Sequence, residues 1–321
     1  MAKPTNTQDR YDITLGVRED LTDFITNVDP EETPVFSSIR KATAGQTFHE
    51  YQRDILGTAN ADNAAIDGDN AVTAARTAPT RVGNYCQIFT KTVGVTGRAE
   101  AVNKAGRKSQ LAYNKSLAML ELKRDGEASL LSNNVAAAGS TGVASKSAGL
   151  GTHIFTNALH GVGGATAAHT SGAPTTAVTP GTNRAFTEAL LKTAAAGCFN
   201  AAGKAPPMVV MSASHKQTAS AFAGISAQRT ETGRKAATVI GAADYYLSDF
   251  GLMAFVPHYI MNTRTDVFGI DPECLRIAYL RGFQSKKLGL VGDSDQEQIL
   301  ADWTLEVRSE KNMFKIANLT A

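Results

Sequence analysis

The chain is 321 residues long, and its 43% of hydrophobic residues is enough to build a packed core. Thirty-two basic and thirty acidic residues leave a formal net charge of +2, which argues against a protein whose main function is to bind nucleic acid. No apolar stretch is long enough for a membrane span, and the N-terminus has no signal-peptide pattern. The chain has three cysteines, Cys86, Cys198 and Cys274, which lie far apart in the sequence. Their number and spacing fit neither a disulfide framework nor a metal site, so we expect reduced thiols in an intracellular protein.

The first 45 residues are predicted to form an arm. Residues 1–19 are polar, and Leu21–Val28 then carry apolar side chains at helical spacing before Pro30. A second short apolar anchor follows at Val35–Ile39. A charged arm with two small anchors favours a tether between subunits over the core of a domain.

Two strands joined by a long polar loop are predicted next. Residues 46–54 and 84–96 are rich in Thr, Tyr, Phe, Ile and Val. Between them, residues 57–80 contain only Ile66 and Val72 as large apolar side chains. Loops of this length are uncommon inside a compact domain and are usually functional. We therefore interpret the segment as a projecting hairpin whose loop lies on a neighbour or moves.

A long helix is predicted over residues 99–132, with an apolar stripe from Tyr113 to Leu131. Unbroken, it would span about 50 Å, which is longer than the helix of an ordinary domain. Gly106 and Gly126 are positions where it can bend or break. We expect this helix to be a structural spine.

The middle of the chain is made mostly of small residues. In residues 133–182, Gly, Ala, Ser, Thr and Pro occupy 35 of 50 positions. Such a segment cannot fill a core by itself, so we expect long loops with a short buried strand at Ile154–Phe155.

Helices and strands then alternate to the C-terminus. Trp303–Val307 alternates apolar and polar residues and is expected to be a strand buried on one face. The chain is therefore predicted to be α+β. The other expected helices cover 184–202 and 214–223, and the other expected strands cover 208–211, 252–260, 275–280 and the segment from Phe314 to Ile316.

No enzyme motif is complete. The glycine run at 161–166 lacks the third glycine of a dinucleotide fingerprint, and Gly203–Lys204 lacks the spacing and hydroxyl of a phosphate loop. Histidines 153, 160 and 169 do not have metal-ligand spacing. His49–Glu50 begins a zinc-protease pattern, but Arg53 stands where the second histidine is required. We expect no cofactor and no metal.

The least implausible hydrolytic pair is Ser214 with His215, completed in space by Asp244 or Asp249. A helix N-cap at Ser214, with His215 in the first turn, explains the same residues better.

Two segments carry a family resemblance. The first runs from Arg18 to Ile39, and the second runs from Ala278 to Asn318 and includes Tyr279–Arg281, Lys286–Asp293 and Asp302–Arg308. Both resemble the major capsid (major head) proteins of tailed double-stranded DNA bacteriophages. The resemblance implies the HK97-like major capsid fold, with an N-terminal arm, an extended β-hairpin called the E-loop, a P domain with a long spine helix, and a mixed α/β axial A domain.

In that fold the domains would divide as follows: arm 1–45, E-loop 46–97, P domain 98–134 with 299–321, and A domain 135–298 with the Gly/Ala/Thr-rich insertion 133–182. The E-loop would lie over the P domain of an adjacent subunit. The residues that we expect at intersubunit contacts are Phe24 and Ile25 in the arm and Asp67, Asp69 and Arg76 at the hairpin tip.

The resemblance implies a structural protein and not an enzyme. Such a subunit self-assembles into the pentamers and hexamers of an icosahedral virion head, which encloses double-stranded DNA without sequence-specific binding. Expected partners are other copies, a portal protein and a separate scaffolding or decoration protein, with assembly in the cytoplasm of the host bacterium. Relatives that crosslink their shells use a hairpin-tip lysine. Residues 57–80 contain none, so we expect a noncovalent shell.

Three alternatives stay open at this point. A nanocompartment shell shares the fold but encloses protein cargo. A hydrolase would use Ser214 and His215. The Gly/Thr-rich middle is also compatible with an adhesin or a decoration protein.

Overall fold

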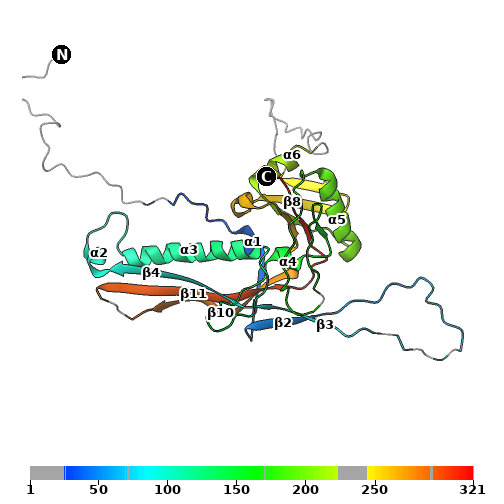
Figure 1. Ribbon diagram of the computed structural model, residues 1–321, viewed down its shortest axis with the longest axis horizontal. Helices are drawn as coiled ribbons and strands as arrows, with labels where there is room; N and C mark the ends of the chain where they lie inside the picture. Colours follow the sequence, from blue (N-terminus) through cyan, green and yellow to red (C-terminus); the bar gives the residue numbers. More distant parts are fainter. Residues whose placement is uncertain are drawn as a thin grey trace, which may run out of the picture.

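The computed structural model describes residues 25, 27–68, 70, 73, 74, 76–169, 171–222, 244–289 and 292–320. Figure 1 shows an elongated lobe, a second lobe on one side of it and a hairpin that projects from their junction. Most of the helix expected at Leu21–Val28 lies outside the described residues. The three that are described, Ile25, Asn27 and Val28, are not helical.

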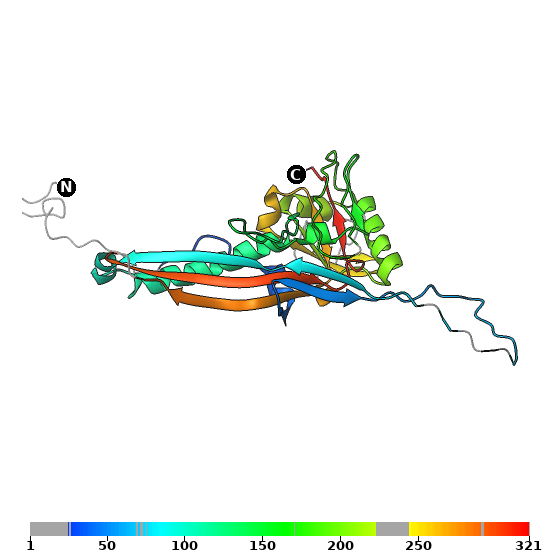
Figure 2. The same ribbon diagram turned by 60° about the horizontal axis from the view of Figure 1, so that its bottom comes forward.

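A four-stranded sheet and one long helix form the elongated lobe (Figures 1 and 2). The strand β1 is parallel to β10, and the other neighbouring strands are antiparallel. The helix α3 lies along β4 and β11, and the apolar side chains between them include Leu122, Phe89 and Trp303. In sheet order the strands are β1 (Arg40–Thr43), β10 (Leu275–Lys287), β11 (Ser294–Val307) and β4 (Gln87–Thr96).

The helix expected over residues 99–132 is split in two, and the break includes Gly106, one of the two positions where a break was expected. A short helix α2 (Gly97–Ala101) is followed by α3 (Gln110–Leu130). The helix α2 ends before Val102, whose backbone is extended, and Gly106 between the two helices has a φ of 74°, a conformation that favours glycine. Ser109 then restarts the helix, since its side chain accepts a hydrogen bond from the backbone N–H of Ala112 at 3.1 Å. The spine is therefore about 31 Å long.

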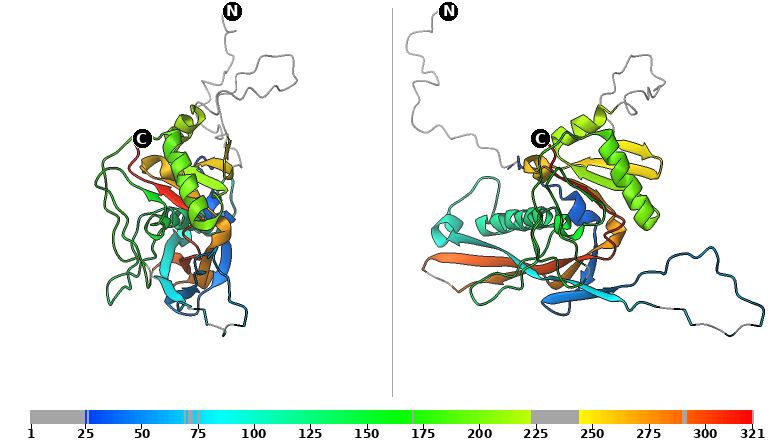
Figure 3. Two further views of the ribbon diagram at one scale, coloured as in Figure 1. Left: turned by 90° about the vertical axis from the view of Figure 1, so that its right-hand side faces the viewer. Right: turned by 45° about the vertical axis from the view of Figure 1, so that its right-hand side comes forward.

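The second lobe contains a six-stranded mixed sheet and two main helices (Figure 3). The helices are α5 (Glu188–Ala202) and α6 (Ala213–Ser220), and α5 packs against β12. The sheet order is β5 (Ala158–Leu159), β12 (Phe314–Ile316), β9 (Val267–Ile270), β6 (Met208–Met211), β8 (Gly251–Pro257) and β7 (Tyr245–Ser248). Two short 3₁₀ helices, η1 (Tyr259–Thr263) and η2 (Pro272–Cys274), complete the lobe. The helices and strands predicted for this part of the chain are confirmed, although their first and last residues differ from the predicted ones.

The hairpin is formed by β2 (Phe48–Arg53) and β3 (Thr80–Tyr85), which form a two-stranded sheet, and β3 also bridges to Gly172 in the small-residue middle. The continuous strand expected over 84–96 is wrong, because the chain leaves one sheet and enters another at Cys86. The backbone N–H of Cys86 donates to the Thr47 carbonyl at 2.7 Å. From Gln87 the chain continues as β4 in the long sheet.

The small-residue middle forms loops, as expected, around the short helix α4 (Leu150–His153) and β5. The buried strand predicted at Ile154–Phe155 is wrong. Ile154 is buried, but its N–H donates to the Leu150 carbonyl at 3.0 Å and closes the last turn of α4. The burial was predictable from the side chain, whereas the backbone conformation depended on this local hydrogen bond.

The strand β11 is buried on both faces near its end, so the expectation of one exposed face is also wrong. Thr304 and Glu306 are buried, as are Trp303 and Leu305. The hydroxyl of Ser147, from the small-residue middle, lies 3.2 Å from that of Thr304. The polar face of β11 is therefore covered by loops that satisfy its hydrogen bonds.

Candidate assembly interface

The hairpin loop, residues 54–79, projects from the body of the molecule and contains no helix or strand within its described part (Figure 2). Its apolar side chains are strongly exposed: Ile55 by 68%, Leu56 by 87% and Ile66 by 76%. Of the predicted contact residues, Asp67 and Arg76 are exposed in this loop, and Asp69 lies outside the described residues. A loop with this exposed apolar content has surface available for another molecule.

The base of the hairpin, in contrast, is bonded to the free edge of β11. The strand β4 pairs with β11 only as far as Trp303, which leaves the backbone of the last residues without a neighbouring strand on that side. Side chains take its place. The hydroxyl of Tyr51 accepts from the N–H of Val307 at 3.1 Å, and the guanidinium of Arg53 donates to the Val307 carbonyl.

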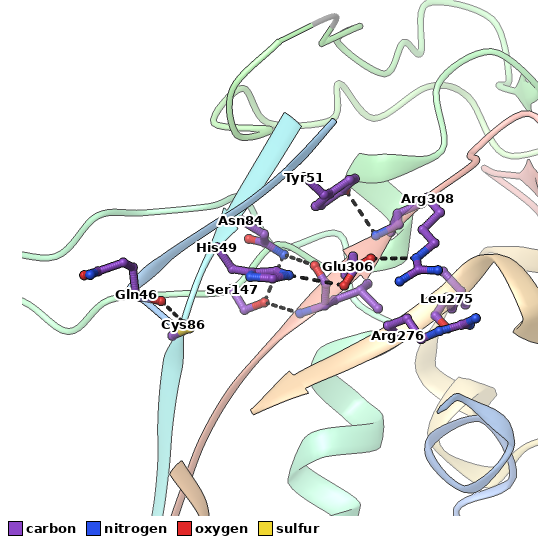
Figure 4. A network of polar contacts seen from close by, with 12 residues as sticks. Gln46, His49, Tyr51, Asn84, Cys86, Ser147, Leu275, Arg276, Glu306 and Arg308 are labelled. Carbon is purple, nitrogen blue, oxygen red and sulfur yellow. Dashed lines mark hydrogen bonds and ion pairs between the residues drawn. The ribbon is translucent and has the colours of Figure 1, made fainter. Parts of the chain in front are cut away.

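Asn84 makes the most buried of these contacts (Figure 4). Its amide nitrogen donates to the Leu305 carbonyl at 3.1 Å and lies within hydrogen-bond distance of Ser147 Oγ and His153 Nε2. Its amide oxygen accepts from the N–H of Ala148 at 2.9 Å. One fully buried side chain thus joins the hairpin, the small-residue middle and β11.

A carboxylate completes the base. Glu306 Oε2 lies 3.2 Å from His49 Nε2, and its Oε1 accepts from Arg308 Nε at 2.7 Å (Figure 4). Burial alone raises the pKa of Glu306, but the hydrogen bonds from His49 and Arg308 outweigh burial and hold the pKa below its usual value. The carboxylate is therefore ionised at neutral pH and holds β2 against β11.

The arm is anchored at a second buried carboxylate. Glu127, in the last turn of the spine helix α3, accepts from the backbone N–H of Val35 at 2.9 Å and of Phe36 at 2.6 Å. These residues begin the short helix α1 (Pro34–Ser38). His258 of the second lobe lies 2.9 Å from the same carboxylate, and both side chains are buried. The arm, the spine and the second lobe therefore meet at one side chain.

Gly126 makes room for the arm beside Glu127. A Cβ atom there would lie 3.1 Å from the ring of Phe36 and 3.2 Å from that of Trp303. The Phe36 ring consequently reaches Trp303, with an edge-to-face centroid separation of 5.6 Å. Of the predicted arm contacts, Ile25 is half-buried and Phe24 lies outside the described residues.

The geometry does not form a hydrolytic pair from Ser214 and His215. Ser212, and not Ser214, is the N-cap of α6, and its hydroxyl lies 2.8 Å from His215 Nδ1. The other ring nitrogen of His215 lies 3.0 Å from the Thr320 carbonyl. Asp244 instead pairs with Lys216. Both nitrogens of His215 are therefore engaged away from Ser214.

The other candidate groups lack the geometry of a reactive centre. Within the described ranges, no three His, Cys, Asp or Glu side chains gather where they would hold a metal ion. The cysteines are free thiols, and burial raises the pKa of Cys86 to about 11, of Cys198 to about 12 and of Cys274 to about 11. Such thiols stay protonated and unreactive at neutral pH. No described helix has the length and apolarity needed to cross a bilayer.

Comparison with solved structures identifies the fold. The structure is similar to a chain from Mycobacterium phage Adephagia, with a TM-score of 0.61 and 10% identity over 98% of this chain and 99% of that one. A chain of the cyanophage A-1(L) capsid gives a TM-score of 0.58 and 12% identity over 95% and 98% of the two chains. A chain of the holo-SrpI encapsulin complex from Synechococcus elongatus gives a TM-score of 0.54 and 12% identity over 98% of this chain and 96% of that one. The architecture is the HK97-like fold of phage capsids and encapsulins.

Comparison of sequences identifies the family. The chain is 30% identical over 117 residues to the major capsid protein of Escherichia phage Phieco32. The matched stretch is 36% of this chain and 33%, about a third, of that relative. The family model of the SU10 major capsid protein matches residues 3–320. With nearly its whole length matched by that model, and with an HK97-like fold, the chain belongs to the SU10 major capsid protein family.

Proposed function

We propose that the chain is the major capsid subunit of a phage and that it assembles, copy against copy, into the pentamers and hexamers of an icosahedral head around double-stranded DNA. The observation that carries the proposal is the hairpin. Its base is tied to the body by buried side chains, while its loop exposes Ile55, Leu56 and Ile66 beyond the body. A neighbouring copy would cover these side chains. The intersubunit contacts proposed from the sequence remain Phe24, Ile25, Asp67, Asp69 and Arg76.

The near-zero net charge supports this role. A wall that confines packed DNA mechanically does not need a basic, DNA-binding surface. A net charge of +2 also limits repulsion among many identical neighbours. Further proposed partners are a portal protein and a separate scaffolding or decoration protein, with assembly in the host cytoplasm.

We also propose a division of the chain into domains. The arm covers 1–45, as expected from the sequence, whereas the pairing of β4 with β11 supports ending the E-loop hairpin at residue 86 and not at 97. The pairing of β10 with β11 supports placing residues 275–313 in the P domain with 87–134. The pairing of β12 with β5 and β9 supports placing its residues in the A domain. The small-residue insertion 133–182 touches both domains.

Electron micrographs of the expressed protein, alone and with a candidate scaffold, test the main proposal. Closed icosahedral shells are the expected result, and a protein that never forms closed particles would overturn it. Denaturing gels of the particles should show a single band at the subunit mass. A ladder of crosslinked oligomers would contradict the noncovalent shell.

A nanocompartment shell is the second candidate, because the fold is also similar to an encapsulin. Purified particles distinguish the two functions. Nuclease-protected DNA inside them supports the phage head, whereas protein cargo without DNA supports the nanocompartment. The sequence family favours the phage head.

We further propose that the chain has no catalytic role. The bonding of His215 to Ser212 and Thr320 supports this, since it leaves no base for Ser214. A panel of acyl substrates tests it. Hydrolysis that disappears in a Ser214→Ala variant would contradict the proposal.

A further inference from the structure

A lysine is buried inside the second lobe without an ion-pair partner. Lys315, the middle residue of β12, has an exposed fraction of 0%. Its neighbours Phe314 and Ile316 pack with Leu191 of α5, so the side chain of Lys315 lies on the opposite face of the sheet. None of the ion pairs among the described residues includes Lys315. Lysines are almost never fully buried unless they are paired, so this position calls for a reason.

The amino group of this lysine lies against the side-chain amide of Asn133, which follows the end of the spine helix α3. Lys315 Nζ donates to Asn133 Oδ1 at 2.8 Å and to the Gly151 carbonyl at 3.0 Å. Because a C=O bond is about 1.23 Å long, the amide carbon Cγ of Asn133 is at most about 4 Å from Nζ. Reacting atoms in a productive arrangement are about 3–3.5 Å apart, so a shift of about 1 Å or less brings Nζ to that carbon.

A carboxylate holds the other side of the same amide. Asn133 Nδ2 donates to Asp266 Oδ2 at 2.7 Å, and Asp266 is buried immediately before β9. Gly151 leaves room for the amide, since a Cβ atom there would overlap Asn133 Oδ1. An amine, an amide carbon and a proton acceptor are thus brought together by three segments that are far apart in the sequence.

The surroundings of Lys315 favour its uncharged form. Burial lowers the pKa of its ammonium group to about 8, although the charge of Asp266 acts in the opposite direction. At pH 7 roughly a tenth of these side chains are free amines, compared with fewer than about one in a thousand for an ordinary lysine. Only the free amine has the electron pair needed to attack a carbonyl carbon.

We propose that Lys315 and Asn133 form an isopeptide bond within one chain. Lys315 Nζ attacks Asn133 Cγ, and a C–N bond forms. Asp266 accepts a proton from the attacking nitrogen and donates it to Nδ2, after which the bond between Cγ and Nδ2 breaks. One lysine ammonium and one amide give one secondary amide and one ammonium ion, with no other reactant. Asn133 is half-buried, so the released ammonia has access to solvent.

The bond fastens the C-terminal strand to the end of the spine. It closes residues 133–315 into a covalent ring that includes most of the second lobe, whose red strand β12 is seen in Figure 2. A crosslink that closes a long loop stabilises a protein mainly by restricting its unfolded chain. The reaction occurs once in each chain, so it is a modification and not an enzymatic turnover. It joins no two copies and does not depend on the proposed assembly.

Mass spectrometry of the full chain tests the bond. The wild-type protein is expected to weigh about 17 Da less than its sequence requires, which is the mass of one ammonia molecule. A tryptic digest should contain a branched peptide that joins the Lys315 and Asn133 segments, with no cleavage after Lys315. The variants Lys315→Met and Asn133→Ala should each have the full mass. Lys311→Met, which replaces an exposed lysine of the same region, is the matched control and should keep the deficit.

The role of Asp266 has its own test. Asp266→Asn keeps the size of the side chain but removes the proton acceptor, and we expect the rate at which the branched peptide forms to fall about a hundredfold or more. Circular dichroism of the variant shows whether it is folded. A folded Asp266→Asn variant that links as fast as wild type would exclude Asp266 from the reaction.

The outcomes separate this inference from the proposed function. A wild-type chain of full mass, without the branched peptide, would overturn the isopeptide bond. A deficit that persists in Lys315→Met would also overturn it, because Asn133 would then have lost ammonia to its own backbone as a cyclic imide. Both results leave the capsid role intact, and failure of the wild-type chain to form shells leaves the isopeptide bond intact.

Discussion

The two ends of the hairpin differ in how they are held. At the base, Tyr51, Arg53 and Asn84 satisfy the backbone of β11 that β4 leaves unpaired. In the loop, Ile55 and Leu56 are exposed by 68% and 87%. The base is ordered by contacts within one chain, whereas the loop has too few contacts of its own. The comparison teaches that contacts within the subunit hold the base of the hairpin, while the apolar side chains of its loop stay exposed.

The arm anchor extends this comparison and carries the largest expected effect. Replacing Glu127 with Ala removes the acceptor of two backbone N–H groups and the partner of buried His258. Removing one member of a buried pair costs about 4 kcal/mol of folding free energy. Urea unfolding of the unassembled subunit measures this loss.

Glu121→Ala is the matched control for that substitution. Glu121 lies on the same helix and pairs with Lys91 at the surface, so its removal should cost less than about 1 kcal/mol. Equal losses in both variants would show that Glu127 does not anchor the arm.

The base of the hairpin should tolerate substitution poorly. Asn84→Ala leaves the N–H of Ala148 and the Leu305 carbonyl without their buried partner, and we expect a loss of about 3 kcal/mol. Denaturant titration gives the free energy of unfolding. Asn63→Ala, in the exposed loop, is the control and should be neutral. A neutral Asn84→Ala variant would remove the distinction between base and loop.

Acid should weaken the base through Glu306. The pKa of this carboxyl is lower in the folded chain than its usual value near 4.5, so the unfolded chain binds the proton more tightly. The stabilisation is therefore complete above that value and is lost as the pH falls through the folded pKa. Glu306→Gln should cost about 1 kcal/mol at pH 7, and its stability should approach that of wild type as the pH falls through the folded pKa of Glu306. Parallel stability curves between pH 7 and 3 would exclude this role.

The loop should show the smallest effect on the isolated subunit. Ile55→Ser with Leu56→Ser changes exposed side chains, so the free energy of unfolding should shift by less than about 0.5 kcal/mol. Assembly should nevertheless weaken, as light scattering at increasing concentration would show. A clear loss of subunit stability would mean that the loop packs on its own chain.

Local signals in the sequence were enough for much of the fold. The apolar run at Met208–Met211 predicts a strand and the apolar stripe of α5 predicts a helix, because each pattern lies within a short stretch of the sequence. The hairpin was predictable because a polar loop separates two β-rich segments. A break in the long helix was expected at Gly106 or Gly126, and only the backbone conformation shows that the helix is interrupted around Gly106 and continues through Gly126.

The residues that hold the candidate interface in place were not predictable. Asn84, Glu127 and Glu306 bond to groups far away in the sequence, and no local pattern marks them. Glu127 follows Lys123, Arg124 and Asp125 in the same helix, so its charge does not distinguish it from its neighbours in the sequence. Asp67 and Arg76 are exposed and have no hydrogen-bond or ion-pair partner among the described residues, so their assignment as intersubunit contacts remains a prediction.

The most direct test replaces residues 57–76 with a short Gly-Asn turn and compares this variant with wild type in electron micrographs. The account predicts closed shells from the wild-type chain and folded, unassembled subunits from the variant, with the circular dichroism of the two alike. Closed shells from the shortened chain would contradict it.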